Sequence, residues 1–152
     1  MAKNSIQFQK GLSLTNFLAQ YGDEEKCYQA LFTFRWPRGF VCPRCGHAGH
    51  CQIASRKVLQ CNYCHTQTSL TAGTIFASTK LPLTVWFLAI YLVTQAKVGI
   101  YSLHLGRTLG VSANTALRIK HKLQQAMKER DDTQPLKELV VIDSNFRFKI
   151  SR

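Results

Sequence analysis

The stretch CPRCGHAGHCQIASRKVLQCNYC, residues 42–64, contains two Cys-x-x-Cys pairs with fifteen residues between them. Two residues between cysteines let one tight turn direct both sulfur atoms at the same ion, and two such pairs at this spacing are typical of a structural zinc site. The pattern therefore predicts a zinc ribbon of short antiparallel strands over residues 40–76. The expected metal ligands are Cys42, Cys45, Cys61 and Cys64.

Four thiolates would complete a tetrahedral shell, so the predicted zinc is structural rather than catalytic. Iron in the same cage is a second candidate metal, and four ordinary thiols or a redox pair are the alternatives without a metal. Further donors lie nearby in the sequence, and we expect them at the surface or beside the ligands: His47, His50, Cys51 and His65. Cys27 lies in a helical pattern and is expected to be a small core residue.

Positive charge is concentrated in the middle of the chain. The net charge is +12, and no Asp or Glu lies between Cys27 and Lys128, whereas twelve of the twenty Lys and Arg do. Such a field attracts polyanions, with nucleic acid as the first candidate. A solvated basic surface and an anionic membrane surface are the alternatives, although no basic amphipathic segment favours the membrane.

No segment has the features of an export signal or a membrane span. The first residues, MAKNSIQFQKGLSL, lack a continuous apolar core, and the most apolar run, residues 81–93, is shorter than the roughly 20 residues of a spanning helix. That run predicts a buried core helix. We therefore expect a cytoplasmic protein, in a reducing compartment where paired cysteines bind metal.

The remaining sequence is mainly helical in pattern, which predicts a small α+β fold. The N-terminal segment, residues 1–39, should contain two short helices separated by Gly22-Asp23, the second ending at Trp36-Pro37. A helical region follows over residues 77–129. Residues 130–138 are polar, contain a proline and predict a linker, and residues 139–152 have the pattern of a first strand.

The region 77–129 has the layout of a helix-turn-helix. Helices are expected over 83–95 and 101–109, with a turn at Gly110-Val111 and a third helix that Ser112 caps and that continues to about residue 128. The third helix should bury one face through Ala116, Ile119, Leu123 and Met127.

The opposite face of the third helix is polar and predicts contacts with DNA. The first residues of a recognition helix enter the major groove, so base reading is assigned to Asn114, Thr115 and Arg118. Phosphate contacts are assigned to Arg107, Lys120, Lys122 and Lys128. The alternative is a plain three-helix bundle with a solvated outer face.

The order of these parts also resembles a known family. The segments RWPRGFVCPRCG, CNYC, TAGTIF, KLPLTVWFLAIYL and LGVSANTA occur in one order, and together they resemble the N-terminal half of zinc-ribbon insertion-sequence transposases. The similarity extends over residues 13–143. In that family a zinc ribbon and a helical DNA-binding region precede an RNase H-like DDE domain.

The resemblance implies a role for Asp143 that this sequence does not support alone. In the family, the strand after the linker carries the first catalytic aspartate, and Asp143 matches it, whereas Ser144 replaces the usual Glu. That residue helps to bind Mg²⁺ only in a complete family member. Nine residues follow Asp143, so we expect a truncated transposase with a vestigial Asp143 and no strand-transfer activity of its own.

The resemblance implies a bacterial, nucleoid-associated protein that binds double-stranded DNA at the terminal inverted repeats of an element. No membrane is expected as a partner, and a homodimer is one arrangement. Two alternatives come from other classes. The chain is either a subunit of an active transposase that another chain completes, or a standalone transcriptional regulator. A dimer on a palindromic promoter would favour the regulator.

Overall fold

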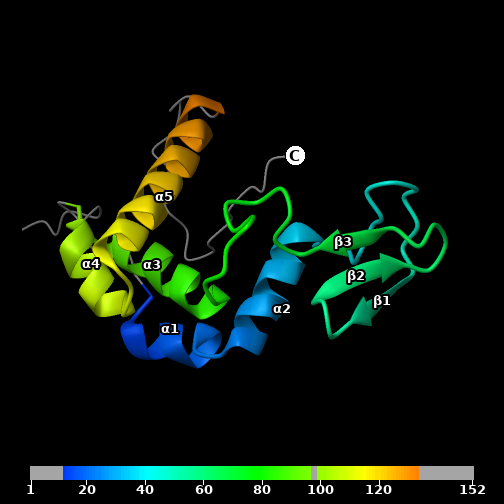
Figure 1. The fold of residues 1–152 in the computed structure, drawn as a ribbon, viewed down its shortest axis with the longest axis horizontal. Coiled ribbons are helices and arrows are strands. Elements are labelled where there is room, and N and C mark those ends of the chain that lie inside the picture. Colours follow the sequence, from blue (N-terminus) through cyan, green and yellow to red (C-terminus); the bar gives the residue numbers. More distant parts are fainter. Residues whose placement is uncertain (1–11, 97–98, 134–152) are drawn as a thin grey trace, which may run out of the picture.

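The ribbon is inserted between two stretches of sequence that together form the helical part of the molecule (Figure 1). The computed structural model describes residues 12–96 and 99–133. The helical part consists of α1 (Leu14–Tyr21), α2 (Glu24–Arg35), α3 (Leu83–Gln95), α4 (Ser102–Leu109) and α5 (Ala113–Thr133). The ribbon, defined here as residues 38–69, contains β1 (His50–Ile53), β2 (Val58–Cys61) and β3 (Gln67–Ser69). This is the predicted small α+β fold.

The two N-terminal helices begin and end where the sequence predicts. The Ser13 hydroxyl accepts a hydrogen bond from the Asn16 amide at 3.2 Å and caps α1. Helix α2 has Glu24 and Glu25 in its first turn, where negative charge suits the helix dipole, and it ends before Trp36-Pro37.

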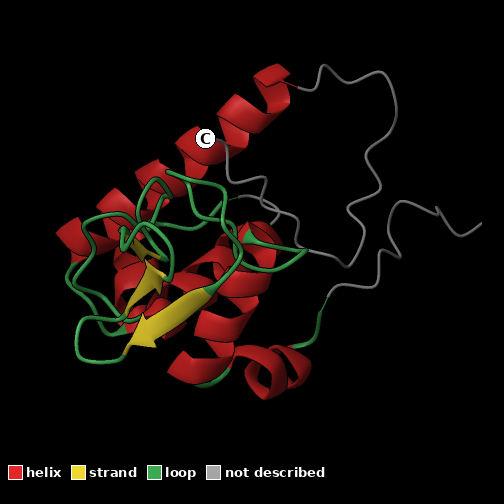
Figure 2. Ribbon diagram, turned by 90° about the vertical axis from the view of Figure 1, so that its right-hand side faces the viewer, coloured by secondary structure: helices red, strands yellow, loops and turns green. Residues whose placement is uncertain are grey.

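The ribbon is a three-stranded antiparallel sheet in the order β1-β2-β3. Val58 on the central strand pairs with Ile53 on one side and Ser69 on the other. The sequence predicted β2 and β3, but His50–Ile53 carries too few apolar residues to be recognised as a strand. Figure 2, viewed from the ribbon side, shows the strands in front of the helices, so the two parts follow one another along the long axis.

Each part has its own core. The helical core takes residues from both sides of the insertion, for example Leu31 of α2, Trp86 of α3 and Ile119 of α5, and it includes Leu70 and Phe76 from the segment that leaves the ribbon. The ribbon core is much smaller and consists of Phe40, Cys42, Leu59 and Cys61. Phe32 and Trp36, near the end of α2, pack against both cores and connect them.

A carboxylate of α2 fixes the start of α3. Pro82 occupies the N-cap position of α3 and provides no side-chain cap. Instead, Glu24 accepts hydrogen bonds from the Leu83 amide at 2.9 Å and the Thr84 amide at 3.2 Å. The first turn of α3 therefore obtains its acceptor from a helix about 60 residues earlier in the chain.

The last three helices follow the predicted order. Gly110 between α4 and α5 has φ of +70°, which glycine adopts without strain, and the Ser112 hydroxyl accepts from the Thr115 amide at 3.2 Å at the start of α5. Gly106 allows close packing of α4 on α5, because a Cβ there would lie 3.0 Å from the Val111 carbonyl oxygen.

Helix α5 is longer than expected and continues to Thr133, so its last turn covers the first residues of the predicted linker. Ala116, Ile119 and Leu123 are buried as predicted, but Met127 is 43% exposed, and its assignment to the buried face was wrong. Beyond Leu123 the helix extends past the helices that support it, as Figure 1 shows for the upper end of α5.

Within the described ranges, no helix is both long enough and apolar enough to cross a membrane. The most apolar helix, α3, has thirteen residues and buries Trp86, Phe87 and Ile90 in the core, as the sequence predicted.

Candidate metal centre and nucleic-acid interface

The two Cys-x-x-Cys turns adopt the same backbone geometry. In the first, Gly46 N–H donates to Cys42 O at 2.9 Å and Cys42 N–H donates to His47 O at 3.0 Å. In the second, His65 N–H donates to Cys61 O at 3.1 Å and Cys61 N–H donates to Thr66 O at 3.0 Å. We call these turns the first and second knuckle, and they present their cysteines in the same way.

The residue that follows the second cysteine has positive φ in both knuckles. Gly46 has φ of +74°, and His65 has φ of +56°. Glycine adopts this conformation at no steric cost, whereas a side chain with a Cβ is strained there. The second knuckle therefore holds His65 against its backbone preference.

The knuckles bring all four cysteine sulfurs together, and within the described residues no other group of His, Cys, Asp or Glu forms such a cluster. All four Sγ atoms lie within 4.8 Å of one another, and two of the cross-knuckle distances are 3.5 Å for Cys42–Cys64 and 3.6 Å for Cys45–Cys61. Tetrahedral bonds of about 2.3 Å place sulfurs about 3.8 Å apart. The four thiols therefore fit a single tetrahedral metal ion.

Hydrogen-bond donors around the sulfurs favour the ionised form that a metal requires. The backbone N–H groups of Cys45 and Arg44 lower the pKa of Cys42. The Thr66 hydroxyl, 3.2 Å from the sulfur, and the Thr66 amide lower the pKa of Cys64 to about 6. These contacts stabilise a thiolate.

Cys45 shows the opposite shift. The His47 N–H lowers its pKa, but burial of the sulfur and the neighbouring thiols Cys64, Cys61 and Cys42 outweigh that effect and raise it to about 12. Four thiols this close cannot all ionise without a cation between them. A bound divalent ion would remove this conflict, because it stabilises every coordinating thiolate.

The nearby donors do not join the cluster. His47, Cys51 and His65 are exposed. His50 is half-buried and packs against aromatic rings, with ring centroids 4.6 Å from Phe40 and 5.9 Å from Phe32. Cys27 is fully buried, as expected, and burial raises its pKa to about 11.

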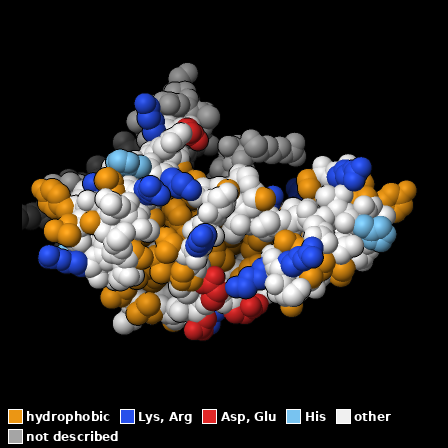
Figure 3. Space-filling view, in the orientation of Figure 1, with side chains coloured by type: hydrophobic (Ala, Val, Ile, Leu, Met, Phe, Trp, Pro, Cys, Tyr) orange, Lys and Arg blue, Asp and Glu red, His pale blue; other side chains and the backbone are white. Residues whose placement is uncertain are grey.

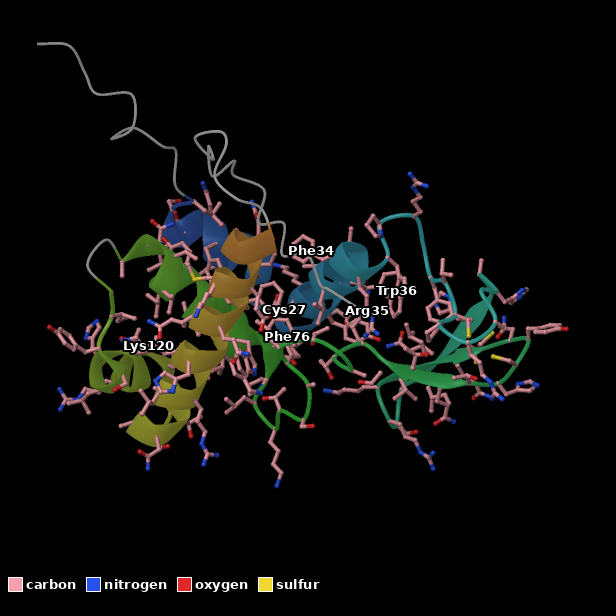
Figure 4. The ribbon with its side chains drawn as sticks, turned by 90° about the horizontal axis from the view of Figure 1, so that it is seen from above. Cys27, Phe34, Arg35, Trp36, Phe76 and Lys120 are labelled. Atoms are coloured by element: carbon pink, nitrogen blue, oxygen red, sulfur yellow. The ribbon has the colours of Figure 1, made fainter. Side chains whose placement is uncertain are left out.

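Arg35 joins the ribbon to the helical part, and the sequence did not indicate this role. Its Nη1 donates to Ser69 O at 2.8 Å and to Leu70 O at 2.7 Å, and its guanidinium lies 4.8 Å from the centre of the Trp36 ring. Burial lowers its pKa. Figure 4 shows Arg35 and Trp36 at the end of α2, where the ribbon begins. The arginine thus connects the entrance of the ribbon to its exit.

The exposed face of α5 contains two of the three predicted base-reading residues. Asn114 and Arg118 are exposed and one helical turn apart. His121 and Gln125 extend the same stripe, opposite the buried Ala116, Ile119 and Leu123. Thr115 lies at the edge of this face, where its hydroxyl hydrogen-bonds that of Ser112 at 2.8 Å.

The predicted phosphate-binding residues surround that stripe. Arg107 in the last turn of α4 and Lys128 on α5 are exposed, and Lys120 is half-exposed. Lys122 is exposed, but its Nζ lies 3.5 Å from Ile75 O and 5.8 Å from the Trp86 ring centre. It contacts the segment between β3 and α3 as well as solvent.

Charge is unevenly distributed on the face in Figure 3. Lys and Arg side chains are spread from the helical part to the ribbon, while acidic side chains gather mainly at the lower edge. The acidic residues at the start of α2 are Asp23, Glu24 and Glu25. The Asp143 assignment lies outside the described residues.

Residues 22–67 match the family model of the transposase zinc-ribbon domain of the IS1595 type. The matched region begins just before α2 and ends in β3, so it contains both knuckles and the helix whose end packs against the ribbon. The four clustered cysteines therefore all lie within a region that matches a zinc-ribbon domain.

The chain is also a distant homologue of a protein of an insertion element. An uncharacterized protein in the transposable element ISH50 of Halobacterium salinarum is 27% identical over 115 residues, which is 74% of this chain. The chain spans 37% of the length of that relative. No solved structure matches the chain. The chain thus contains a transposase-type zinc ribbon and is related to an insertion-element protein.

Proposed function

We propose that this chain binds double-stranded DNA at the ends of an insertion element, using α4 and α5 as a helix-turn-helix. A structural zinc ion in the ribbon would support this unit. The similarity to a transposase zinc ribbon and to an insertion-element protein supports the choice of DNA. Terminal inverted repeats are the proposed target.

The observation that carries the proposal is the exposed polar stripe of α5. Asn114 and Arg118 lie near the start of a helix that begins after a tight turn at Gly110, which is where a recognition helix meets base edges. Asparagine pairs with adenine and arginine with guanine in the major groove, each through two hydrogen bonds. Both side chains are exposed and can reach a groove.

The surrounding charge suits contact with phosphates. Arg107, Lys120 and Lys128 are on α4 and α5, and between Cys27 and Lys128 there is no carboxylate to repel a DNA backbone. Lys122 would exchange its contact with Ile75 O for a phosphate oxygen. Thr115 would contribute to base reading, because it lies at the start of α5.

Zinc is the proposed metal because the four donors are all thiols in a closed tetrahedral arrangement. Cys42, Cys45, Cys61 and Cys64 would fill the coordination shell and leave no position for a substrate. The ion would hold the knuckles together and carry no chemistry. A homodimer on an inverted repeat is one arrangement of the complex.

The test is a comparison of duplex DNA carrying an element end with a random duplex, by fluorescence anisotropy at several salt concentrations. Arg118→Ala and Asn114→Ala should each weaken binding to the end sequence by about 1–3 kcal/mol and reduce its preference over the random duplex. Lys128→Ala should weaken both complexes equally and reduce the salt dependence by about one ion.

Lys26→Ala is the matched control. It removes one positive charge from α2, where Lys26 lies 3.4 Å from Asp23 and away from α5. It should bind both duplexes as the unaltered protein does. The two variants, Arg118→Ala and Asn114→Ala, could prefer the end sequence over the random duplex as strongly as the unaltered protein does. That result would overturn the assignment of α5 as the helix that reads the bases.

A further inference from the structure

The tip of the ribbon exposes an aromatic ring on a fixed backbone. Tyr63 lies between Cys61 and Cys64 in the second knuckle, and 75% of its surface is exposed. Its neighbours are held in place, because Asn62 N–H donates to Gly49 O at 3.1 Å and His65 N–H donates to Cys61 O at 3.1 Å. A rigidly mounted, exposed tyrosine is a ready stacking surface.

A second ring comes from the first knuckle. The His47 and Tyr63 ring centroids are 5.8 Å apart, with their planes inclined by 37°. Gly49 leaves the space that His47 occupies, because a Cβ at position 49 would lie 2.8 Å from His47 Nε2. We call His47 and Tyr63 the ring pair. It forms only where the two knuckles meet.

The sequence around the ring pair contains basic side chains and no carboxylates. Residues 38–67 contain no Asp or Glu, and their four Lys and Arg side chains are all exposed: Arg38, Arg44, Arg56 and Lys57. Figure 3 shows basic and histidine side chains at the ribbon end of the molecule. Exposed rings among cations match the two chemical features of a nucleic-acid strand, its base faces and its phosphates.

The ring pair suits an unpaired base rather than a duplex. In a duplex each base face is covered by its neighbours, so a tyrosine ring can stack only on a base that has left the helix or lies in a single strand. We infer that the ring pair of the ribbon binds single-stranded DNA by stacking Tyr63 on an unpaired base. The choice of DNA over RNA rests on the proposed function.

Fluorescence anisotropy tests this inference. The probe is a fluorescein-labelled oligothymidine of about fifteen nucleotides, titrated with the zinc-loaded full chain. Tyr63→Ser should weaken binding roughly tenfold, as expected for the loss of one stacked base, and Tyr63→Phe should keep it because the ring remains. His47→Ser should give a smaller loss. Zinc content and circular dichroism of each variant show whether the knuckles are intact.

A crosslinking experiment tests the contact directly. A 5-iododeoxyuridine oligonucleotide irradiated with the unaltered protein should attach to the peptide that contains Tyr63, as read by mass spectrometry. Equal affinity of the Tyr63→Ser variant and the unaltered protein for the oligothymidine would overturn the inference. So would a crosslink found only on peptides outside the ribbon.

Two further comparisons separate this inference from the proposed function. Tyr63→Ser should leave duplex binding unchanged, and Arg118→Ala should leave oligothymidine binding unchanged, because the two surfaces are on different parts of the molecule. Failure of Arg118→Ala to alter duplex binding contradicts the proposed function alone. Tighter binding of oligouridine than of oligothymidine would overturn the assignment to DNA.

Discussion

The helical part and the ribbon are stabilised in different ways. The helical core contains fifteen buried residues taken from all five helices and the segment before α3, whereas the ribbon core contains four, and two of these are cysteines. Burial of apolar surface can hold the first together. Four residues cannot offset the conformational entropy of a 32-residue insertion, so we expect the ribbon to need a bound metal for its fold. The comparison predicts that the helical part folds without metal and that the ribbon does not.

Metal removal should have the largest effect and should be confined to the ribbon. Structural zinc contributes on the order of 10 kcal/mol in small zinc domains, so a chelator or Cys61→Ser should unfold residues 38–69. The helices should persist, because their core contains none of the four clustered cysteines. Far-UV circular dichroism should therefore lose little helical signal.

Thiol labelling at pH 8 gives the residue-level reading. With metal bound, iodoacetamide should modify Cys51 alone, and after chelation it should also modify the four clustered cysteines. Cys27 should stay unmodified in both states, because it is buried and burial raises its pKa to about 11. Modification of Cys27 on chelation would show that the helical part also depends on the metal.

The next largest effect should come from the helical core and should leave the metal centre intact. Ile119→Ala removes buried methyl groups at the contact of α5 with the rest of the core and should cost about 2–5 kcal/mol in the free energy of unfolding. Leu117→Ala is the control, because Leu117 is on the same helix and 39% exposed. Urea denaturation followed by the helical signal measures both. A change in zinc stoichiometry in the Ile119 variant would contradict the independence of the two parts.

A smaller effect is expected at the junction. Arg35→Met removes the guanidinium donor from the carbonyl groups of Ser69 and Leu70 and should cost about 1–3 kcal/mol, although Ser69 O still accepts from the Ala72 amide at 3.4 Å. The cost should shrink in the chelated protein, where the strand that carries Ser69 is already released. Arg38→Met, on an exposed side chain, should be neutral. An equal cost with and without metal would show that Arg35 stabilises the helical part only.

The smallest effects should distinguish the two knuckles. Gly46→Ala places a Cβ at φ of +74° and should lower the stability of the metal-bound ribbon by about 1 kcal/mol. His65→Gly removes the strain at φ of +56° and should raise it by up to about 1 kcal/mol. Competition with a chromogenic zinc chelator measures both variants. The same sign of change in both would contradict the matching geometry of the knuckles.

Local signals explain which features could be predicted from the sequence. The bounds of α3 match the expected residues 83–95, since Pro82 and the polar residues after the apolar run mark its ends. The clustering of the cysteines followed from their spacing, because two tight turns and an antiparallel hairpin leave the sulfurs few other positions.

Some features could not be predicted from the sequence, because the residues around them do not indicate the contacts that form them. Nothing near Arg35 in the sequence indicates that it reaches the carbonyls of Ser69 and Leu70, and the polar strand His50–Ile53 forms because β2 pairs with it. Met127 continues the apolar periodicity of α5 and lies near Ile90 and Val93 of α3, but 43% of it remains exposed. The partners of Arg35 lie about 35 residues away, whereas β1 belongs to a local hairpin and was missed because its own residues are mostly polar.

The paired contacts of Arg35 have a consequence for how such proteins can diversify. They hold the point where the chain leaves the helices next to the point where it returns, at 2.8 Å and 2.7 Å from one guanidinium nitrogen. The length of the inserted ribbon should therefore not affect the positions of the helices. A ribbon with another loop length or another exposed tip could therefore replace this one without changing the position of α5 in the helical part.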